Sequence, residues 1–276
     1  MNDYPRIGVV FCAYGIPEYV EQSIKPWVEL KKEYPVFIAA VHGQFKEYHE
    51  MGIEDNDKET QLILLDKLHK GDIDYVYIQN APNNPNKIYQ TEAQIRDKGV
   101  QWLLEQKVDY IWLWDLDEET TVEEIKKAIN FIQKNDLIAW FRTYYKNLVF
   151  DEKHYIDFCP PRIFKVNYDN IYKFKRIIYD NDAEYHGIIT RDILSYQQLP
   201  ALTIPRSIFN PVHFSWLNNE RSHQKILYAE KRWSPPNGNG CSFKWENGHL
   251  QFNAEYYKRI GQPIPEVFTI DKDYSS

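Results

Sequence analysis

The chain has 276 residues, of which 43% are hydrophobic, so it holds enough apolar material for one large domain with a packed core. Its formal charge of −7 excludes a broad polyanion-binding face, and we expect no nucleic-acid partner. The three cysteines (Cys12, Cys159 and Cys241) are spaced neither for zinc nor for a disulfide framework. They favour a reducing, cytoplasmic location. We expect no signal peptide, and no apolar run approaches the roughly 18 residues that a transmembrane helix needs.

The first 120 residues predict strands that alternate with helices. Apolar runs predict buried strands at 7–13, 36–41, 75–79 and 110–114, while helical spacing predicts helices at about 17–34, 59–69 and 91–106. Residues 44–57 are polar and irregular, and NAPNNPNK at 80–87 predicts a loop. This order predicts an α/β fold with a mostly parallel sheet, flanked by helices and joined by right-handed crossovers.

The pattern changes after Thr121. A helix over 122–135 is followed by shorter stretches rich in strand-forming residues, at 137–145, 162–166, 174–179 and 208–216. A second helix is expected over 220–233, and Asn247-Gly248 between two alternating runs predicts a hairpin. We therefore expect a smaller mixed sheet with a C-terminal helix and hairpin. No linker separates the two parts, so the sequence predicts one domain over 1–276, in the parts 1–120 and 121–276.

The stretch VDYIWLWDLDEETT at 108–121 ends a buried strand in a group of carboxylates. Side chains alternate along an extended chain, so Asp115 and Asp117 point to one side. Paired carboxylates at the carboxyl end of a buried strand suit a hard divalent cation, and this is where ligands bind in open α/β sheets. A second interpretation stays open: the group only begins the next helix, because Thr120 or Thr121 with Glu123 or Glu124 matches a capping box.

Three segments together resemble the GT-A (Rossmann-like) glycosyltransferases, and among them the inverting family 2. VVFCAYGIPEYVEQSI resembles the family's first strand, base-cradling turn and helix, and PPRIFKV resembles a later strand that carries an arginine and an aromatic residue. TEAQIRDKGVQWLLEQKVDYIWLWDLDEE resembles the stretch from the Arg-Asn-x-Gly element to the Asp-x-Asp motif. The chain departs from the pattern at His42, where many members have an aspartate, and at Asp97, where they have asparagine.

The resemblance implies a donor that is a nucleotide-diphosphate sugar, with UDP or GDP as the nucleotide, and a glycan or another hydroxyl acceptor. It assigns the donor to 1–120 and the acceptor to 121–276. It also implies a divalent cation, Mn²⁺ or Mg²⁺, with Asp117 as the more direct ligand and Asp115 facing the ribose or sharing the cation through water. His213 is the candidate third ligand, although a histidine that merely packs between aromatic strands explains it as well.

Inversion at the anomeric carbon requires a base that deprotonates the acceptor hydroxyl. The acidic turn DNDAEYHG lies where the family usually places this acid, and we predict Glu184 as the base with Asp182 beside it. Asp182 and Glu184 share a parity along an extended chain, so they can face one cleft. A solvated acidic turn, which also includes Asp180, is the alternative explanation.

The remaining donor-binding candidates come from two regions. Arg96 is placed to pair with the diphosphate or with the nearby carboxylates, and Lys225 lies on a basic helix that also carries Arg221. The alternative explanation for both Arg96 and Lys225 is that they are solvated charges on the surface of a helix. The turn after the first strand, with Ala13, Tyr14 and Gly15, is placed by position to contact the nucleotide.

Other classes of protein fit the sequence less well. A haloacid dehalogenase-type phosphatase has its Asp-x-Asp after the first strand and a Thr or Val where this chain has Glu119. A sugar-nucleotide pyrophosphorylase needs a glycine-rich loop after the first strand, whereas AYGIPEY supplies a single glycine. A non-catalytic carbohydrate- or nucleotide-sugar-binding protein of the same fold remains the alternative to a glycosyltransferase.

Overall fold

A computed structural model describes residues 4–52, 57–79, 89–166, 201–217, 219–233 and 241–270, with the side chains of 47, 93, 215 and 231–233 left out. The segment expected as a strand at 174–179 and the predicted bases Asp182 and Glu184 lie outside these residues. The described chain divides into two compact units. Unit 1 holds residues up to 144 together with 159–166 and 201–210, and unit 2 holds 145–158 and 211–270.

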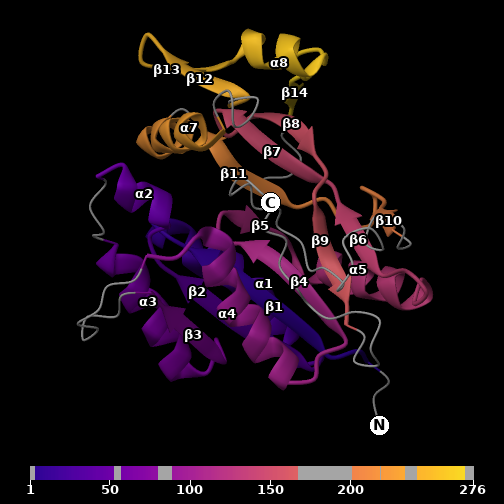
Figure 1. The fold of residues 1–276 in the computed structure, drawn as a ribbon. Coiled ribbons are helices and arrows are strands. Elements are labelled where there is room, and N and C mark those ends of the chain that lie inside the picture. The colour runs from indigo at the N-terminus through magenta and orange to yellow at the C-terminus, as the bar shows by residue number, and fades with distance from the viewer. Residues whose placement is uncertain are drawn as a thin grey trace. The chain divides into compact units, whose positions relative to one another are not determined.

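Unit 1 is built on a seven-stranded sheet in the order β10-β6-β9-β4-β1-β2-β3 (Figure 1). Its central strands β1, β2, β3 and β4 are parallel, β9 is antiparallel to both of its neighbours, and β10 is parallel to β6. The strands are β1 (Ile7–Ala13), β2 (Val36–His42), β3 (Tyr75–Ile78), β4 (Tyr110–Asp115), β6 (Trp140–Thr143), β9 (Pro161–Lys165) and β10 (Ala201–Ile204); β5 is Glu118–Glu119. The predicted α/β fold with a mostly parallel sheet is confirmed.

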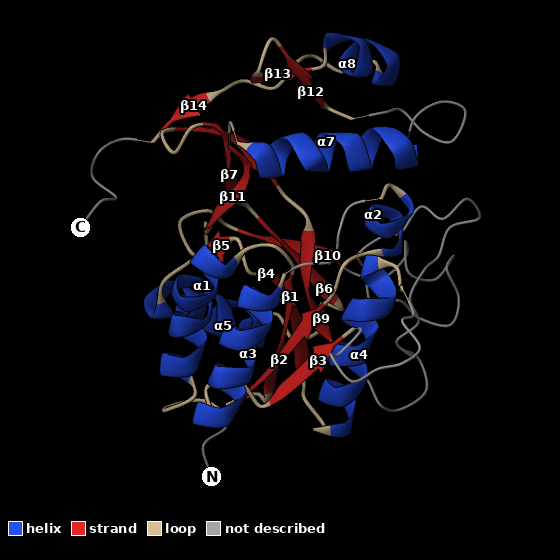
Figure 2. Ribbon diagram, turned by 90° about the vertical axis from the view of Figure 1, so that its left-hand side faces the viewer, coloured by secondary structure: helices blue, strands red, loops and turns tan. Residues whose placement is uncertain are grey.

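Helices cover both faces of this sheet, with α1, α3 and α5 on one side and α4 on the other (Figure 2). Their bounds are α1 (Pro17–Leu30), α2 (Lys46–Glu50), α3 (Lys58–Lys70), α4 (Glu92–Glu105) and α5 (Val122–Lys134). Strands covered on both faces are apolar throughout, which explains why all seven residues of β1 are buried. On the α1 face, the Trp27 ring lies 4.9 Å from that of Trp112 and 5.6 Å from that of Trp114.

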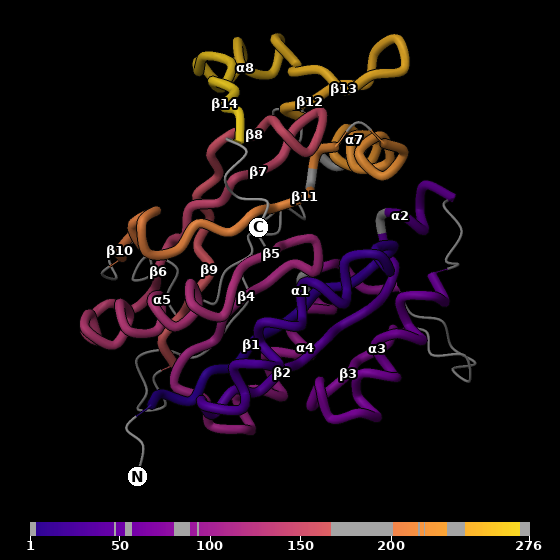
Figure 3. Tube along the Cα trace, turned by 180° about the vertical axis from the view of Figure 1, so that it is seen from behind, coloured from indigo at the N-terminus to yellow at the C-terminus, as the bar shows by residue number. Residues whose placement is uncertain are grey.

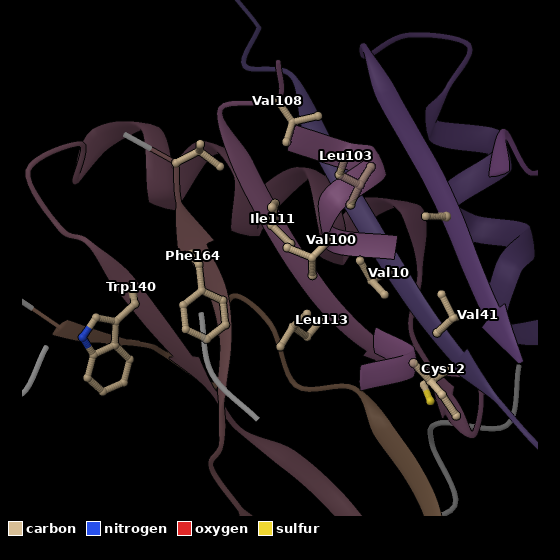
Figure 4. Close-up of a cluster of buried hydrophobic side chains, with 13 residues drawn as sticks. Val10, Cys12, Val41, Val100, Leu103, Val108, Ile111, Leu113, Trp140 and Phe164 are labelled. Carbon is tan, nitrogen blue, oxygen red and sulfur yellow. The ribbon is translucent and has the colours of Figure 1, made fainter. Parts of the chain in front are cut away.

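Helix α4 packs very close to the sheet, and two glycines allow this approach. A Cβ on Gly99 would lie 3.0 Å from Val10 and 3.1 Å from Val41, and a Cβ on Gly8 would lie 2.8 Å from Leu103. The core on this face joins α4 to β1, β2 and β4, as the close-up in Figure 4 shows. The helix that carries Arg96 is therefore held firmly against the strand that carries Asp115.

Two helices of unit 1 begin with capping boxes. Thr91 and Gln94 form one at α4, and Thr121 and Glu124 form the other at α5. The capping box that the sequence predicted after the group of carboxylates is therefore present at the start of α5. It is formed by Thr121 and Glu124 alone, so helix capping does not account for Asp115 and Asp117.

Unit 2 contains a mixed sheet in which β14, β8, β7 and β11 are neighbours in that order, and its trace can be followed in Figure 3. Strand β7 pairs antiparallel with β8 and parallel with β11. A separate hairpin, β12–β13, and two helices complete the unit. The elements are β7 (Tyr145–Phe150), β8 (His154–Phe158), β11 (Val212–Leu217), α7 (Glu220–Trp233), β12 (Phe243–Glu246), β13 (His249–Phe252), α8 (Ala254–Ile260) and β14 (Phe268–Thr269).

The predicted hairpin is confirmed, because Asn247 and Gly248 join β12 to β13 with φ values of 53° and 80°. Positive φ at both central residues is what a two-residue turn of this kind requires, and Asn-Gly tolerates it best. The hairpin packs Phe243 and Leu250 into the small core of unit 2, which also contains Val149 and Ile226.

A few boundaries differ from the prediction. Helix α1 ends at Leu30 rather than near Tyr34, because a turn precedes Pro35 and proline disfavours a helical residue before it. Helix α2 lies within the stretch expected to be irregular. The three cysteines are free, and within the described residues no helix is long and apolar enough to cross a membrane.

Candidate metal and nucleotide site

The carboxyl ends of three parallel strands meet at one edge of the unit 1 sheet. In the strand register, Cys12 of β1 is opposite Asp115 of β4, and Ala13 is opposite His42 of β2. Parallel strands of an open sheet place their ligand site at this edge. The predicted residues Ala13, Tyr14, Gly15 and Asp115 are therefore brought together by the topology of one unit.

Asp115 lies between two arginines from distant parts of the chain. Arg96 of α4 donates through Nη2 to Oδ1 of Asp115, and Arg162 of β9 donates through Nη2 to Oδ2 at 2.9 Å. Both guanidinium side chains are buried, with 8% and 6% of their surface exposed. Arg96 also donates to Glu92 Oε1, through Nε at 3.1 Å and Nη2 at 2.9 Å. The predicted pairing of Arg96 with a nearby carboxylate is thus present.

Burial and neighbouring charges shift the pKa values of several residues in this group. Burial acts against a charged Arg96, yet the carboxylates Asp115 and Glu92 raise the pKa of Arg96 well above its ordinary value. Burial also raises the pKa of Glu118 well above the usual range of a carboxyl, although Arg162 acts in the opposite direction. The Cys12 thiol is buried, and burial raises its pKa, as expected for an unreactive core residue.

Asp117 is the most buried of the three predicted metal ligands, with 3% of its surface exposed. One carboxylate oxygen of Asp117 and one of Asp115 lie within 4.8 Å of each other. Three carboxylates (Glu92, Asp115 and Glu118) pair with two guanidinium groups (Arg96 and Arg162), and a fourth carboxylate, Asp117, lies close to Asp115. Their formal charges leave an excess of two negative charges, or one when Glu118 is protonated, and the donors are oxygens. This donor set fits a hard divalent cation.

The turn after β1 is fixed by a carboxylate that the sequence analysis did not select. Asp57, the residue that caps α3, accepts from Gly15 N at 2.5 Å, His42 Nε2 at 2.9 Å and Thr60 N at 3.3 Å. Burial opposes ionisation of Asp57, but these three donors lower its pKa below the ordinary value. Gly15 adopts φ +63°, a conformation that glycine permits. The carboxylate of Asp57 therefore lies at the carboxyl end of β2, beside His42. Many members of the family that the sequence resembles have an aspartate at the position of His42.

Aromatic rings surround the same turn. The half-buried ring of Tyr14 stacks on Tyr48 with 6.3 Å between centroids and lies 5.7 Å from the ring of His42. Phe45 lies 5.8 Å from Tyr48. A turn lined by flat rings is chemically suited to a planar ligand group such as a nucleobase.

Unit 2 holds the other two predicted site residues that the structure describes, His213 and Lys225. His213 is buried on β11, opposite Asn147 of β7, with its ring 6.2 Å from that of Tyr145 and 6.3 Å from that of Phe158. Lys225 lies on α7, where its Nζ is 5.8 Å from the centre of the Trp216 ring. The aromatic surroundings expected for His213 are present.

Four residues of the unit 1 edge were not selected from the sequence as site residues, namely His42, Asp57, Glu118 and Arg162. The segment PPRIFKV does contain Arg162, and the acidic stretch contains Glu118, so a weak signal was present for both. Glu118 and Arg162 are 44 positions apart, and their contact depends on the pairing of β9 with β4. Asp57 carried only the signal of a helix cap.

Comparisons with known proteins give weak structural likenesses. No protein-family model matches the sequence, and no curated protein matches it. A mannosyltransferase from Pyrobaculum calidifontis, solved with GDP-Man and Mn²⁺, has a TM-score of 0.45 and 11% identity, over 84% of this chain and 62% of that one. S. aureus TarS 1–349 has a TM-score of 0.36 and 14% identity, over 52% of this chain and 36% of that one.

A nucleoside-diphosphate-sugar pyrophosphorylase from Vibrio cholerae has a TM-score of 0.38 and 11% identity, over 80% of this chain and 99% of that one. The chain thus spans about a third of TarS 1–349 and less than two thirds of the mannosyltransferase. The expected resemblance to glycosyltransferases is confirmed to the extent that such enzymes are among the matches. At these identities and TM-scores the matches carry no functional argument, which rests on the residues of the site.

Proposed function

We propose that the chain is a metal-dependent glycosyltransferase, which moves a sugar from a nucleotide-diphosphate sugar to a hydroxyl acceptor with inversion. One observation carries the proposal: the half-buried Asp115, which is paired with the buried guanidinium of Arg96, lies close to the buried Asp117 at the carboxyl edge of a parallel sheet. Carboxylates suit a divalent cation, and a guanidinium suits a phosphate. A ligand that joins a cation to phosphates matches both.

Within this proposal, Asp117 and Asp115 hold Mn²⁺ or Mg²⁺, and His213 is the third protein ligand. The bound cation would supply Lewis acidity to a diphosphate leaving group. Arg96 and Lys225 bind the phosphates, and the turn of Ala13, Tyr14 and Gly15 holds the nucleotide of a UDP- or GDP-sugar. Asp57 supports this turn through the main-chain N–H of Gly15.

The acceptor step needs a base. We propose that Glu184 takes the proton of the acceptor hydroxyl, with Asp182 in support, because a carboxylate in the acceptor part suits this reaction. The acceptor is a glycan or another hydroxyl compound. A cytoplasmic location for the reaction agrees with three free cysteines.

Two other functions remain distinguishable by experiment. A pyrophosphorylase would release a nucleoside triphosphate when given a nucleotide sugar and pyrophosphate, and the single glycine of the turn after β1 argues against its phosphate loop. A non-catalytic binding protein would bind nucleotide sugars and leave them intact.

The first test is a thermal-shift screen of UDP, GDP, ADP and CDP with Mn²⁺, with Mg²⁺ and with a chelator. A ligand that binds only the native state stabilises it by about 2.7 kcal/mol at 100 times its Kd. We expect stabilisation by UDP or GDP with either cation and its loss with the chelator. The absence of any shift under all metal conditions would reject the proposal.

A further inference from the structure

A closed set of contacts links Asp115 to two buried residues that have no role in the proposed function so far. Arg162 Nη2 donates to Asp115 Oδ2 at 2.9 Å and to Glu118 Oε1 at 2.5 Å. Glu118 in turn accepts the main-chain N–H of Asp115 through Oε2 at 3.2 Å. Side chain and main chain of Asp115 are therefore fixed by the same pair of residues.

The pair is taken almost completely out of water. The exposed fraction of the side chain is 6% for Arg162 and 0% for Glu118. A buried ion pair adds little net stability, because removing two charges from water costs about as much as their attraction returns. Stability alone is therefore a poor explanation for this pair, whereas its effect on the geometry of Asp115 is direct.

The register of the sheet explains how Arg162 reaches this position. Strand β9 runs antiparallel to β4, with Ile163 opposite Trp112, so the chain before Ile163 lies beside the carboxyl end of β4. Arg96 holds the other oxygen of Asp115 from α4. A carboxylate can accept at about four lone-pair positions, so two guanidinium contacts are compatible with a cation at the same group.

We propose that Arg162 and Glu118 are positioning residues, which hold Asp115 in the orientation that cation binding at Asp115 and Asp117 requires. This inference rests on the proposed function. Residues that orient metal ligands typically contribute about 10–100-fold to metal affinity, because they remove the freedom of the ligand to rotate away. The pair acts through Asp115 and need not touch the cation or the sugar donor.

The test measures the affinity of the nucleotide-free protein for Mn²⁺ by electron paramagnetic resonance of unbound Mn²⁺. Arg162→Lys keeps the charge but replaces the planar guanidinium, whose Nη2 donates to both Asp115 and Glu118, with an ammonium group. Glu118→Gln keeps the shape but removes the charge. Each should weaken Mn²⁺ binding by about 10–100-fold. The double variant should lose no more than the weaker-binding single variant, since the two residues act as one unit.

Arg142→Lys is the matched control, because Arg142 is an exposed arginine on the neighbouring strand β6. Its Mn²⁺ affinity should equal that of the wild type. The melting temperature of every variant is measured in the same samples. If only one of the two single variants folds, its Mn²⁺ affinity tests the inference. If neither folds, Arg162 and Glu118 are structural residues and the inference is wrong.

The outcomes separate this inference from the function on which it rests. A wild type that binds no Mn²⁺ overturns both. A wild type that binds Mn²⁺, with folded variants that bind it equally tightly, overturns only the positioning role. Losses that simply add in the double variant also contradict it, because they would show two independent contributions.

Discussion

The two units bury polar groups of different kinds. Among the described residues of unit 1, the buried polar set includes five that are ordinarily charged: Asp57, Arg96, Asp117, Glu118 and Arg162. The corresponding set in unit 2 is Lys146, Asn147, His213 and Ser222, so only Lys146 is formally charged at neutral pH. Unit 2 instead places the aromatic rings of Tyr145 and Phe158 around His213.

This difference shows that most of the buried charged side chains among the described residues lie in unit 1. Charges are costly to bury unless they are paired, and in unit 1 Arg96 and Arg162 pair with Asp115, while Asp57 pairs with His42. The net negative charge around Asp115 suits a cation, whereas the flat rings around His213 suit a neutral, partly apolar ligand such as a sugar. The comparison predicts that substitutions in unit 1 change metal binding and that most substitutions in unit 2 do not.

The first prediction concerns Asp117, where we expect a complete loss of the metal-dependent ligand response. Asp117→Asn keeps the size of the side chain but removes a charge from the excess of negative charge at the edge of the sheet. We expect the stabilisation by UDP or GDP with Mn²⁺ to disappear, a loss of about 2.7 kcal/mol when measured at 100 times the wild-type Kd. Without ligand the melting temperature should stay the same or rise, because repulsion with neighbouring carboxylates is relieved.

Glu119→Gln is the control for this experiment, since Glu119 is an exposed carboxylate two positions further along. It should keep the full ligand response. A response that survives in Asp117→Asn would remove Asp117 from the metal site.

The second prediction concerns the proposed base. Glu184→Gln keeps the shape of the side chain but cannot accept a proton, so sugar transfer should fall by about 10²–10⁴-fold while donor binding is retained. Asp182→Asn should have a smaller effect. The measurement is the rate of product formation at saturating donor. Near-normal transfer by Glu184→Gln would refute the assignment, and a larger loss at Asp182 would exchange the two roles.

The third prediction tests the division into units. Trp112→Ala in unit 1 and Phe243→Ala in unit 2 each remove a fully buried aromatic side chain, which costs about 3–5 kcal/mol. Because the unit 2 core is the smaller, we expect its transition at the lower temperature in calorimetry. Phe243→Ala should shift only that transition. A single transition that both variants shift equally would show that the units unfold together.

The smallest effect is expected for Asp57. Asp57→Ala removes the N-cap of α3 and should cost about 0.5–2 kcal/mol of unfolding free energy. The pKa of Asp57 is lowered in the folded state, so its contribution is fully present above the unfolded pKa of about 3.9 and is lost as pH falls through the folded value. Denaturant titrations at neutral pH and below about pH 4 should show the variant and wild type converging in acid. A constant difference would contradict this linkage.

The sequence predicted the elements that have strong local signals. Strands β1 and β4 follow continuous apolar runs, and the β12–β13 turn follows from Asn247-Gly248. Helix α2 was missed, because a helix of five residues is too short to show a helical period. The end of α1 depends on a local turn, and it lies a few residues before the predicted end.

The site was only partly predictable for a physical reason. Asp115, Asp117 and Arg96 were selected because they are close together along a strand and helix of recognisable pattern. The roles of Arg162 and Asp57 depend on contacts across 47 positions to Asp115 and 42 positions to Gly15. Such contacts are created by strand pairing and helix packing, so no local pattern in the sequence reveals them.

The most direct test of the central claim is the slow hydrolysis of donor sugars that a glycosyltransferase shows without an acceptor. The protein is incubated with a panel of UDP- and GDP-sugars and Mn²⁺, and released nucleoside diphosphate is measured. We predict release from at least one donor, which a chelator abolishes and which Asp117→Asn does not show. No release from any donor, or release that neither the chelator nor the substitution changes, would contradict the account.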